Sequence, residues 1–362
     1  MSKAYLILEN GKVFEGTSFG KVGKTIGEVV FNTGMVGYLE TLTDKNNCGQ
    51  IIVQTFPMIG NYGVISEDFQ SEGAKIAGYV VREMCDKPSN FRCEGTLEDY
   101  LIKEGVVGIC GLDTRALTRV LREEGTMNGM ISDSPEVTEA VLEEIKSFKI
   151  ENPVKDVTRA NEEFTSPLAK TTIGLFDFGT GKSVIDILLH LDCNVKVFNA
   201  YSKAEDILNA GVNGVLVSDG PGNPKDNMEA VAEIKKLLEK KVPMFGIGLG
   251  HELMALAGGA DTFKLPYGHR GSSGPCKNLE TGVLSIITQN HGYCVVRENL
   301  PENMTVSFEN ANDKTIEGIK YTDAPAFSVQ FRPDAGTSPT GEKSLYVSFI
   351  ELCKEVNFNA VK

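Results

Sequence analysis

In the second half of the chain, short apolar runs alternate with amphipathic stretches, and this alternation restricts the fold more than any other feature. Thr172 to Asp177 reads as a strand, followed by a helix from Ser183 to Leu191 and a second strand from Asn194 to Phe198. The order recurs with strands at Gly214 to Ser218 and Pro243 to Ile247. Since intervening helices join parallel strands, we expect an α/β fold with a mostly parallel sheet flanked by helices on both faces.

The first part of the chain follows a different pattern, because its short β-type runs are separated by turns. Tyr5 to Glu9 and Lys12 to Phe14 flank Asn10-Gly11, a dipeptide typical of a type I′ hairpin. A helix is expected up to Glu124, with Asp113 as its N-cap. These features predict a separate α+β, β-rich domain.

At 362 residues the chain exceeds what one hydrophobic core usually serves. Between the two patterns lies a polar stretch that includes Glu151-Asn152-Pro153 and ends near Pro167. We therefore expect an N-terminal domain over residues 1–150, a linker over 151–170 and the α/β domain over 171–362.

Charge and composition exclude several classes of partner. The net charge is −13, and the basic residues are scattered, which argues against nucleic acid and anionic membranes. No apolar stretch approaches the length of a membrane span or a signal-peptide core, so a cytoplasmic protein is expected. The eight cysteines form no C-x-x-C pair and the four histidines no i, i+4 pair, so no metal site is predicted. Small molecules or another protein remain as partners.

Two glycine-rich segments lie at expected strand ends, where ligands bind in such sheets. Phe178 to Ser183 ends like a phosphate-binding loop, but Phe176 stands where that motif requires its first glycine. Gly246 to Gly250 begins like a dinucleotide fingerprint, but His251 takes the place of the third glycine. The second segment fits a nucleophile elbow better, and its centre, Gly248, has no side chain.

The stretch Pro243 to Ala260 resembles the elbow of class I glutamine amidotransferases, whose pattern is G-[IVL]-C-x-G-H-Q. Gly248 takes the cysteine position and Glu252 the glutamine position. Other motifs, in register over nearly the whole chain, resemble the small-subunit family of carbamoyl-phosphate synthetases: Gly27 to Thr33, Ile59 to Gly63, Asp113 to Arg119, Gly220 to Pro224 and Gln289 to Tyr293. The resemblance implies an amidotransferase-like domain behind an N-terminal domain specific to that subunit.

In this family a cysteine thiolate attacks glutamine, while a histidine and a glutamate of the motif Q-x-H-P-E serve as base and orienting group. That motif corresponds to Gln330 to Asp334, so the three catalytic positions are occupied by Gly248, Arg332 and Asp334. Glycine offers no nucleophile, and arginine has no lone pair with which to accept a proton. The resemblance therefore predicts a chain unable to hydrolyse glutamine.

A residual glutamine pocket is implied by the same resemblance. Backbone N–H groups of the glycine turn and of the residue after the elbow would hold a carboxylate or oxyanion. Arg332 and Glu252 could pair inside this pocket. The alternative for the glycines is that they serve only to permit tight turns. The implied pocket residues are Cys48, Gly220, Gly222, Leu249, Glu252, Asn290, Gly292 and Tyr293.

The resemblance also implies a partner and a role. The partner would be the synthetase large subunit, which would carry ATP and magnesium, so this chain needs no cofactor of its own. Together they would form carbamoyl phosphate for pyrimidine or arginine synthesis, and the pocket would hold glutamine or a related small molecule. The alternative is a stand-alone binding or regulatory module that kept the fold and changed its ligand.

Overall fold

The computed structural model describes residues 2–333 and 343–356. The chain divides into two compact units, Met1–Glu151 and Asn152–Lys362. Each unit has hydrophobic clusters of its own, so each has the packing that independent folding requires.

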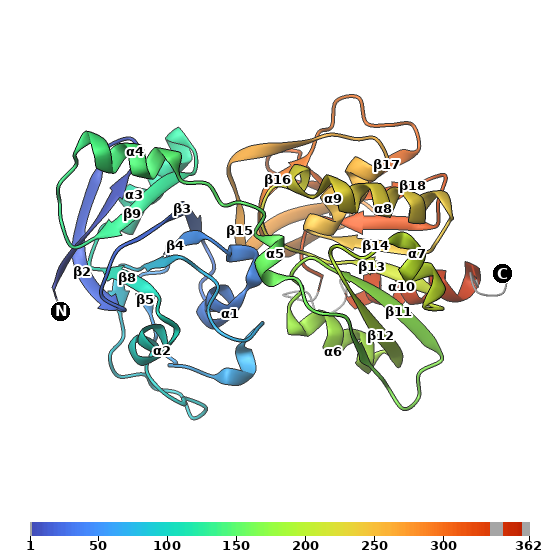
Figure 1. Cartoon of the computed structure of the whole chain (residues 1–362), viewed down its shortest axis with the longest axis horizontal. Coiled ribbons are helices and arrows are strands. Elements are labelled where there is room, and N and C mark those ends of the chain that lie inside the picture. Colours follow the sequence, from blue (N-terminus) through green and yellow to red (C-terminus); the bar gives the residue numbers. More distant parts are fainter. Residues whose placement is uncertain (1, 334–342, 357–362) are drawn as a thin grey trace. The chain divides into compact units, whose positions relative to one another are not determined.

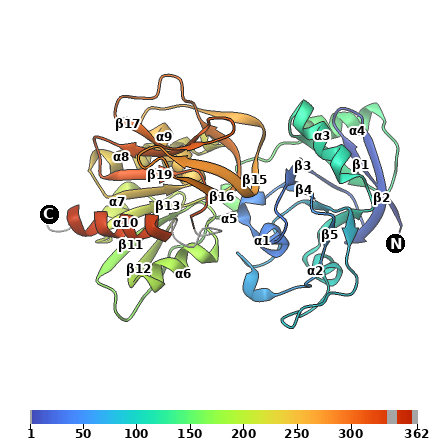
Figure 2. The same cartoon turned by 180° about the vertical axis from the view of Figure 1, so that it is seen from behind.

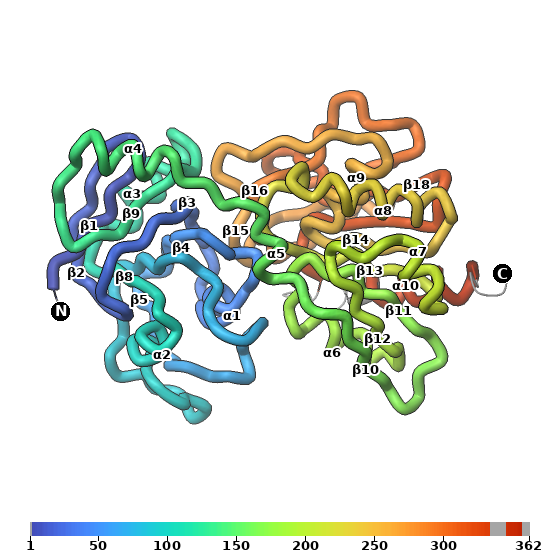
Figure 3. Tube along the Cα trace, viewed as in Figure 1, coloured from blue at the N-terminus to red at the C-terminus, as the bar shows by residue number. Residues whose placement is uncertain are grey.

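Seven strands of the first unit close into a barrel in the order β1-β2-β8-β6-β4-β3-β9 (Figure 1). The path of the chain through this barrel can be followed in Figure 3. Two further strands, β5 (Met58–Ile59) and β7 (Glu83–Met84), form a separate pair. The barrel strands are β1 (Lys3–Leu8), β2 (Val13–Gly20), β3 (Thr25–Asn32), β4 (Gln50–Gln54), β6 (Gly78–Val80), β8 (Val107–Cys110) and β9 (Met127–Ser132). The helices are α1 (Tyr38–Thr43), α2 (Leu97–Glu104), α3 (Thr114–Glu124) and α4 (Glu139–Ser147).

Local signals explain two of these elements. Asp113 is the N-cap of α3, because its carboxylate accepts a hydrogen bond of 3.0 Å from the Ala116 amide, as predicted. The β1–β2 hairpin also forms at the predicted place. Its turn is not type I′, because Gly11 has a positive φ of 84° whereas Asn10 is not among the residues with positive φ.

The second unit is built on a ten-stranded sheet in the order β10-β12-β11-β13-β14-β19-β18-β17-β15-β16. The five strands from β12 to β19 in this order pair in parallel, and those beyond β19 pair antiparallel. The sheet is therefore parallel at its centre, as the sequence predicted, and continues as an antiparallel extension. The strands are β10 (Glu162–Phe164), β11 (Thr171–Asp177), β12 (Cys193–Asn199), β13 (Gly214–Val217), β14 (Met244–Ile247), β15 (Thr262–Asn278), β16 (Leu284–Val295), β17 (Met304–Asn310), β18 (Ile316–Tyr321) and β19 (Ala326–Val329).

Helices cover both faces of the parallel strands (Figure 2). Val215 and Val217 pack in one cluster with α7, α8 and α9, whereas Leu216 packs in a second cluster with α6 and α10. Because successive residues point to opposite faces, burial of all three explains the uninterrupted apolar run. The helices are α6 (Lys182–His190), α7 (Ala204–Asn209), α8 (Met228–Glu239), α9 (Leu249–Ala257) and α10 (Lys343–Val356).

The segment 151–170, expected as a linker, carries a short helix, α5 (Val154–Val157), and a strand, β10 (Glu162–Phe164). Strand β10 pairs antiparallel with β12. The backbone amide of Arg159 donates a 2.6 Å hydrogen bond to the side chain of Asp177, at the end of β11. Most of this segment therefore packs as part of the second unit.

Among the described residues, no helix is both long and apolar enough to cross a membrane.

Candidate functional site

A sharp strand-turn-helix connection joins β14 to α9, and Gly248 forms its apex. Gly248 has φ 55° and ψ −117°, a conformation that residues with a side chain rarely adopt. Its amide donates to the carbonyl of Val329 on the neighbouring strand (2.9 Å), and its carbonyl accepts from Glu252 (3.2 Å). The backbone thus has the geometry of a nucleophile elbow, although its apex carries no nucleophile.

The side chain of Asp219 fills the space in front of this apex. A Cβ atom at residue 248 would overlap Oδ1 and Cγ of Asp219. Oδ1 accepts hydrogen bonds from the backbone amides of Gly220 (2.8 Å) and Leu249 (3.1 Å). These two N–H groups are the ones that the family resemblance assigns to the substrate oxyanion. A carboxylate of the chain itself therefore occupies the candidate anion site.

The sheet register explains why Asp219 faces Gly248. Val217 pairs with Gly246 across the parallel strands β13 and β14. Asp219 lies two residues after Val217, and Gly248 lies two residues after Gly246. Asp219 was not among the site residues predicted from the sequence. Its position could have indicated a role, because Asp219 directly precedes the Gly220-Pro221-Gly222 turn at the end of a buried strand.

Glu252, on the first turn of α9, is buried behind the apex. Burial raises the pKa of Glu252 to about 8; a hydrogen bond from Gln330 opposes this rise and the negative charge of Asp219 adds to it. The Gln330 side-chain amide donates to Glu252 Oε1 at 3.0 Å. The hydrogen-bond partner of Glu252 Oε1 is therefore Gln330 rather than Arg332.

The other predicted site residues are distributed over several elements. Arg332 is buried, and its amide donates to the carbonyl of Thr288 (2.9 Å). Gly222 has a positive φ of 93°, which explains the glycine in the turn after β13. Asn290, Gly292 and Tyr293 lie on β16. Cys48 belongs to the first unit, and Asp334 lies outside the described residues.

Two cysteines of the second unit, Cys276 and Cys294, are poorly placed to replace the missing nucleophile. Cys276 and Cys294 are buried, and burial raises the pKa of the Cys294 thiol far above its usual value. His251 follows the elbow, but burial lowers the pKa of this histidine to about 3, and its Nδ1 lies 2.8 Å from Ser328 Oγ. These groups are packed as parts of the core.

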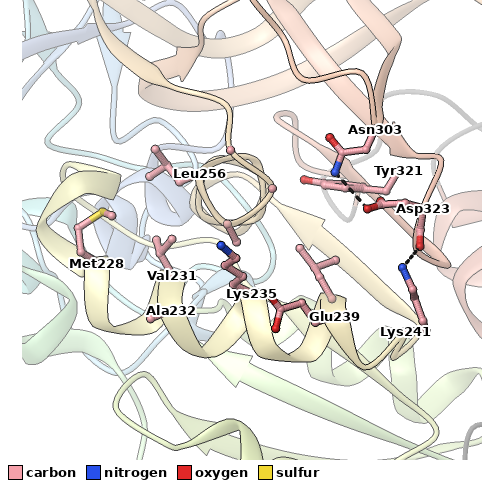
Figure 4. Close-up of a pocket in the computed structure, with 14 residues that line it drawn as sticks. Met228, Val231, Ala232, Lys235, Glu239, Lys241, Leu256, Asn303, Tyr321 and Asp323 are labelled. Atoms are coloured by element: carbon pink, nitrogen blue, oxygen red, sulfur yellow. Dashed lines mark hydrogen bonds between the residues drawn. The ribbon is translucent and has the colours of Figure 1, made fainter.

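A groove of about 500 Å³ lies elsewhere on the second unit, beside α8 and α9 (Figure 4). Asp323 lies in it, where its side chain accepts a 3.3 Å hydrogen bond from Asn303 and its carbonyl accepts one from Lys241. None of the residues lining the groove belongs to the elbow or the glycine turn. The groove is thus separate from the candidate site.

The parallel sheet between two layers of helices, with an elbow at the end of β14, defines the second unit as a class I glutamine amidotransferase domain, and the family model of that description matches residues 174–352. The model described as "Carbamoyl-phosphate synthase small chain, CPSase domain" matches residues 6–131. The chain belongs to the carbamoyl-phosphate synthase small-chain family.

Full-length relatives agree with the family matches. The carbamoyl phosphate synthase small chain of Clostridium perfringens is 45% identical over 96% of this chain and 99% of its own. That of Bacillus caldolyticus is 44% identical over 98% of both chains. The pyrimidine-specific small chain of Bacillus subtilis is 44% identical over 97% of this chain and 96% of its own.

Proposed function

We propose that this chain acts as the small subunit of a carbamoyl-phosphate synthase but does not hydrolyse glutamine. The observation that carries the second part is the Asp219 carboxylate, which binds the amides of Gly220 and Leu249 in front of Gly248. A glutamine carbonyl would have to displace this carboxylate before the same two donors could stabilise an oxyanion.

Three requirements for acyl transfer through a thioester are unmet. Gly248 provides no nucleophile, and Arg332, at the histidine position, provides no base because its guanidinium stays protonated. The oxyanion donors are already occupied by Asp219. Loss of any one of these three requirements would greatly reduce glutamine hydrolysis, so the loss of all three supports a catalytically inactive site.

The proposed role follows from the family. The chain would bind a synthetase large subunit in the cytoplasm, where the partner would hold ATP and magnesium and would use free ammonia. Supply of carbamoyl phosphate for pyrimidine synthesis is supported by the pyrimidine-specific relative, and arginine synthesis is the other candidate pathway. The remaining pocket would bind glutamine or a related molecule without cleaving it.

Purified chain, alone or with its large subunit, should release no ammonia from glutamine above background. Production of glutamate would be measured with a glutamine-hydrolysing relative as positive control. Ammonia supplied directly should support carbamoyl-phosphate formation by the complex. Glutamate production that disappears when a single cysteine is replaced would contradict the proposal, because it would identify a working thiol.

Removal of residues 1–151 should abolish binding to the large subunit, because the N-terminal unit is what distinguishes this family from other amidotransferases. The truncated chain should start at Asn152, so that β10 stays paired with β12. Binding would be measured by co-purification and calorimetry, with circular dichroism to verify folding. Undiminished binding by 152–362 would assign the interface to the second unit. A full-length monomer that ignores the large subunit would instead favour a stand-alone module.

A further inference from the structure

Three side chains on different strands of the antiparallel extension come together outside the elbow site. They are His269 on β15, His291 on β16 and Glu317 on β18. One potential ligand atom from each lies within 4.8 Å of the other two. His291 and Glu317 are buried, and the His269 side chain retains 16% exposure, which leaves a route from solvent.

The hydrogen bonds of the two histidines fix which nitrogen faces the cluster. His269 Nε2 lies 2.8 Å from Asp313 Oδ2, and His291 Nδ1 lies 2.7 Å from the carbonyl oxygen of Tyr293. A carboxylate and a carbonyl only accept, so each of these outer nitrogens carries the proton. The inner nitrogens, Nδ1 of His269 and Nε2 of His291, therefore direct lone pairs toward the cluster. Metal-bound histidines are oriented by outer partners of these two kinds.

Glu317 brings an acceptor that is not fully satisfied. Its side chain has no exposed surface. Oε1 accepts from Gln289 Nε2 (2.5 Å) and Asn310 Nδ2 (3.2 Å), whereas Oε2 is buried with no hydrogen-bond partner among the described residues. A buried acceptor without a donor is costly, so the site has capacity for a further positive group.

The side-chain amide of Gln289 lies among the three ligand atoms. Its Nε2 is 2.5 Å from Glu317 Oε1, 3.3 Å from His291 Nε2 and 3.4 Å from His269 Nδ1. An amide nitrogen has two hydrogens and cannot serve three acceptors. A cation at this point would satisfy all three at once.

We propose that His269, His291 and Glu317 form a zinc site, with Asp313 and the Tyr293 carbonyl orienting the two histidines. Two imidazoles and a carboxylate are a donor set that Zn²⁺ binds, with water completing a tetrahedron, whereas Mg²⁺ and Ca²⁺ prefer oxygen donors. With bonds of 2.0–2.1 Å the ligands would approach to roughly 3.3 Å of one another, once the Gln289 amide swings aside. The ion would join β15, β16 and β18 and fix the strand that carries Asn290 and Gly292.

The histidine spacing in the sequence gave no indication of this site, because the ligands come from three strands rather than one helix. The prediction of no metal was based on the spacings of the histidines and cysteines along the chain. The zinc proposal does not depend on whether the chain hydrolyses glutamine.

The test uses the full chain, freed of metal with a chelator, and Zn²⁺ as the probe. Competition with a chromogenic chelator should give one tight site per chain, and zinc should raise the melting temperature. X-ray absorption should show nitrogen and oxygen near 2.0–2.1 Å and no sulfur near 2.3 Å. Absence of stoichiometric binding, or a sulfur shell from cysteine, would overturn the proposal.

Variants distinguish a metal site from a network held by hydrogen bonds alone. Glu317→Gln keeps the shape but removes the anionic ligand, and should weaken zinc binding by about 100-fold; Asp313→Asn should weaken it by about 10-fold. His190→Gln, at an exposed histidine of α6, is the matched control and should change nothing. Gln289→Ala empties the centre and should bind zinc at least as tightly as the unmodified chain. Undiminished binding by Glu317→Gln, or zinc binding lost in Gln289→Ala, would contradict the assignment.

Discussion

Replacement of Gly248 by alanine is expected to destabilise the second unit by about 2–4 kcal/mol. The apex has a positive φ of 55°, and an added Cβ would overlap the carboxylate of Asp219. Both the backbone strain and the overlap are absent with glycine. The loss would be measured as the difference in the free energy of unfolding of the second unit between the variant and the unmodified chain, in urea titrations.

A double-mutant cycle separates the two causes. Asp219→Ala alone should cost about 1–3 kcal/mol, because the amides of Gly220 and Leu249 lose their acceptor. The combination Gly248→Ala with Asp219→Ala should be more stable than the sum of the single losses, by roughly 1–3 kcal/mol, because the overlap is gone. Strictly additive losses would mean that Asp219 does not fill the space in front of the apex.

The same geometry predicts what a restored cysteine would do. Gly248→Cys alone should show no glutamine hydrolysis, because Arg332 cannot act as a base and Asp219 still occupies the oxyanion donors. Adding Arg332→His, with Asp334→Glu, should remain inactive until the Asp219 carboxylate is also removed. Activity of Gly248→Cys by itself would contradict this account of the site.

Much of the central sheet was predictable, because local signals and tertiary structure agree there. The runs at Thr172 to Asp177 and Gly214 to Ser218 each have an uninterrupted apolar centre, and both form buried parallel strands. Asp113 capped its helix because the interaction is local. Closure of the N-terminal strands into a barrel was not predictable, since it depends on pairings such as β2 with β8 between residues far apart in the chain.

Contacts across strands limited the prediction of the site in the same way. The family motif indicated Gly248, but the position of Asp219 in front of it depends on the register of β13 against β14. The partner of Glu252 depends on how Gln330 follows β19. Sequence patterns predict which residues belong to the same helix or strand. Strand register decides which side chains face one another, and local sequence patterns do not encode register.

Glu252→Gln is expected to make the second unit more stable at pH 8, by roughly 2–4 kcal/mol. The pKa of Glu252 rises from 4.5 to about 8 in the folded chain, chiefly through burial. The variant retains an oxygen to accept the hydrogen bond from Gln330 and has no proton to lose. It also restores the residue type of the family motif at this position.

The sign of the pH dependence follows from which state holds the proton. Below pH 4.5 Glu252 is protonated in both the folded and the unfolded chain, so it does not change the stability with pH. Between pH 4.5 and about 8 only the unfolded chain releases the proton, so the stability of the fold decreases as the pH rises. Above about 8 the folded chain releases it too, and the loss is complete. The free energy of unfolding of Glu252→Gln should therefore exceed that of the unmodified chain by an amount that increases from pH 5 to pH 8. Urea unfolding at each pH would measure this difference.

Glu233→Gln supplies a control of opposite sign. The Ala204 amide donates to the Glu233 carboxylate at 3.0 Å and is the main cause that lowers the pKa of Glu233, with Lys236 adding to it. Its ionised form stabilises the fold above the unfolded pKa, so Glu233→Gln should lose stability at neutral pH and approach the unmodified chain in acid. If Glu252→Gln and the unmodified chain gave parallel stability curves from pH 5 to 8, Glu252 would be ionised in the fold. That result would contradict the rise in the pKa of Glu252 to about 8.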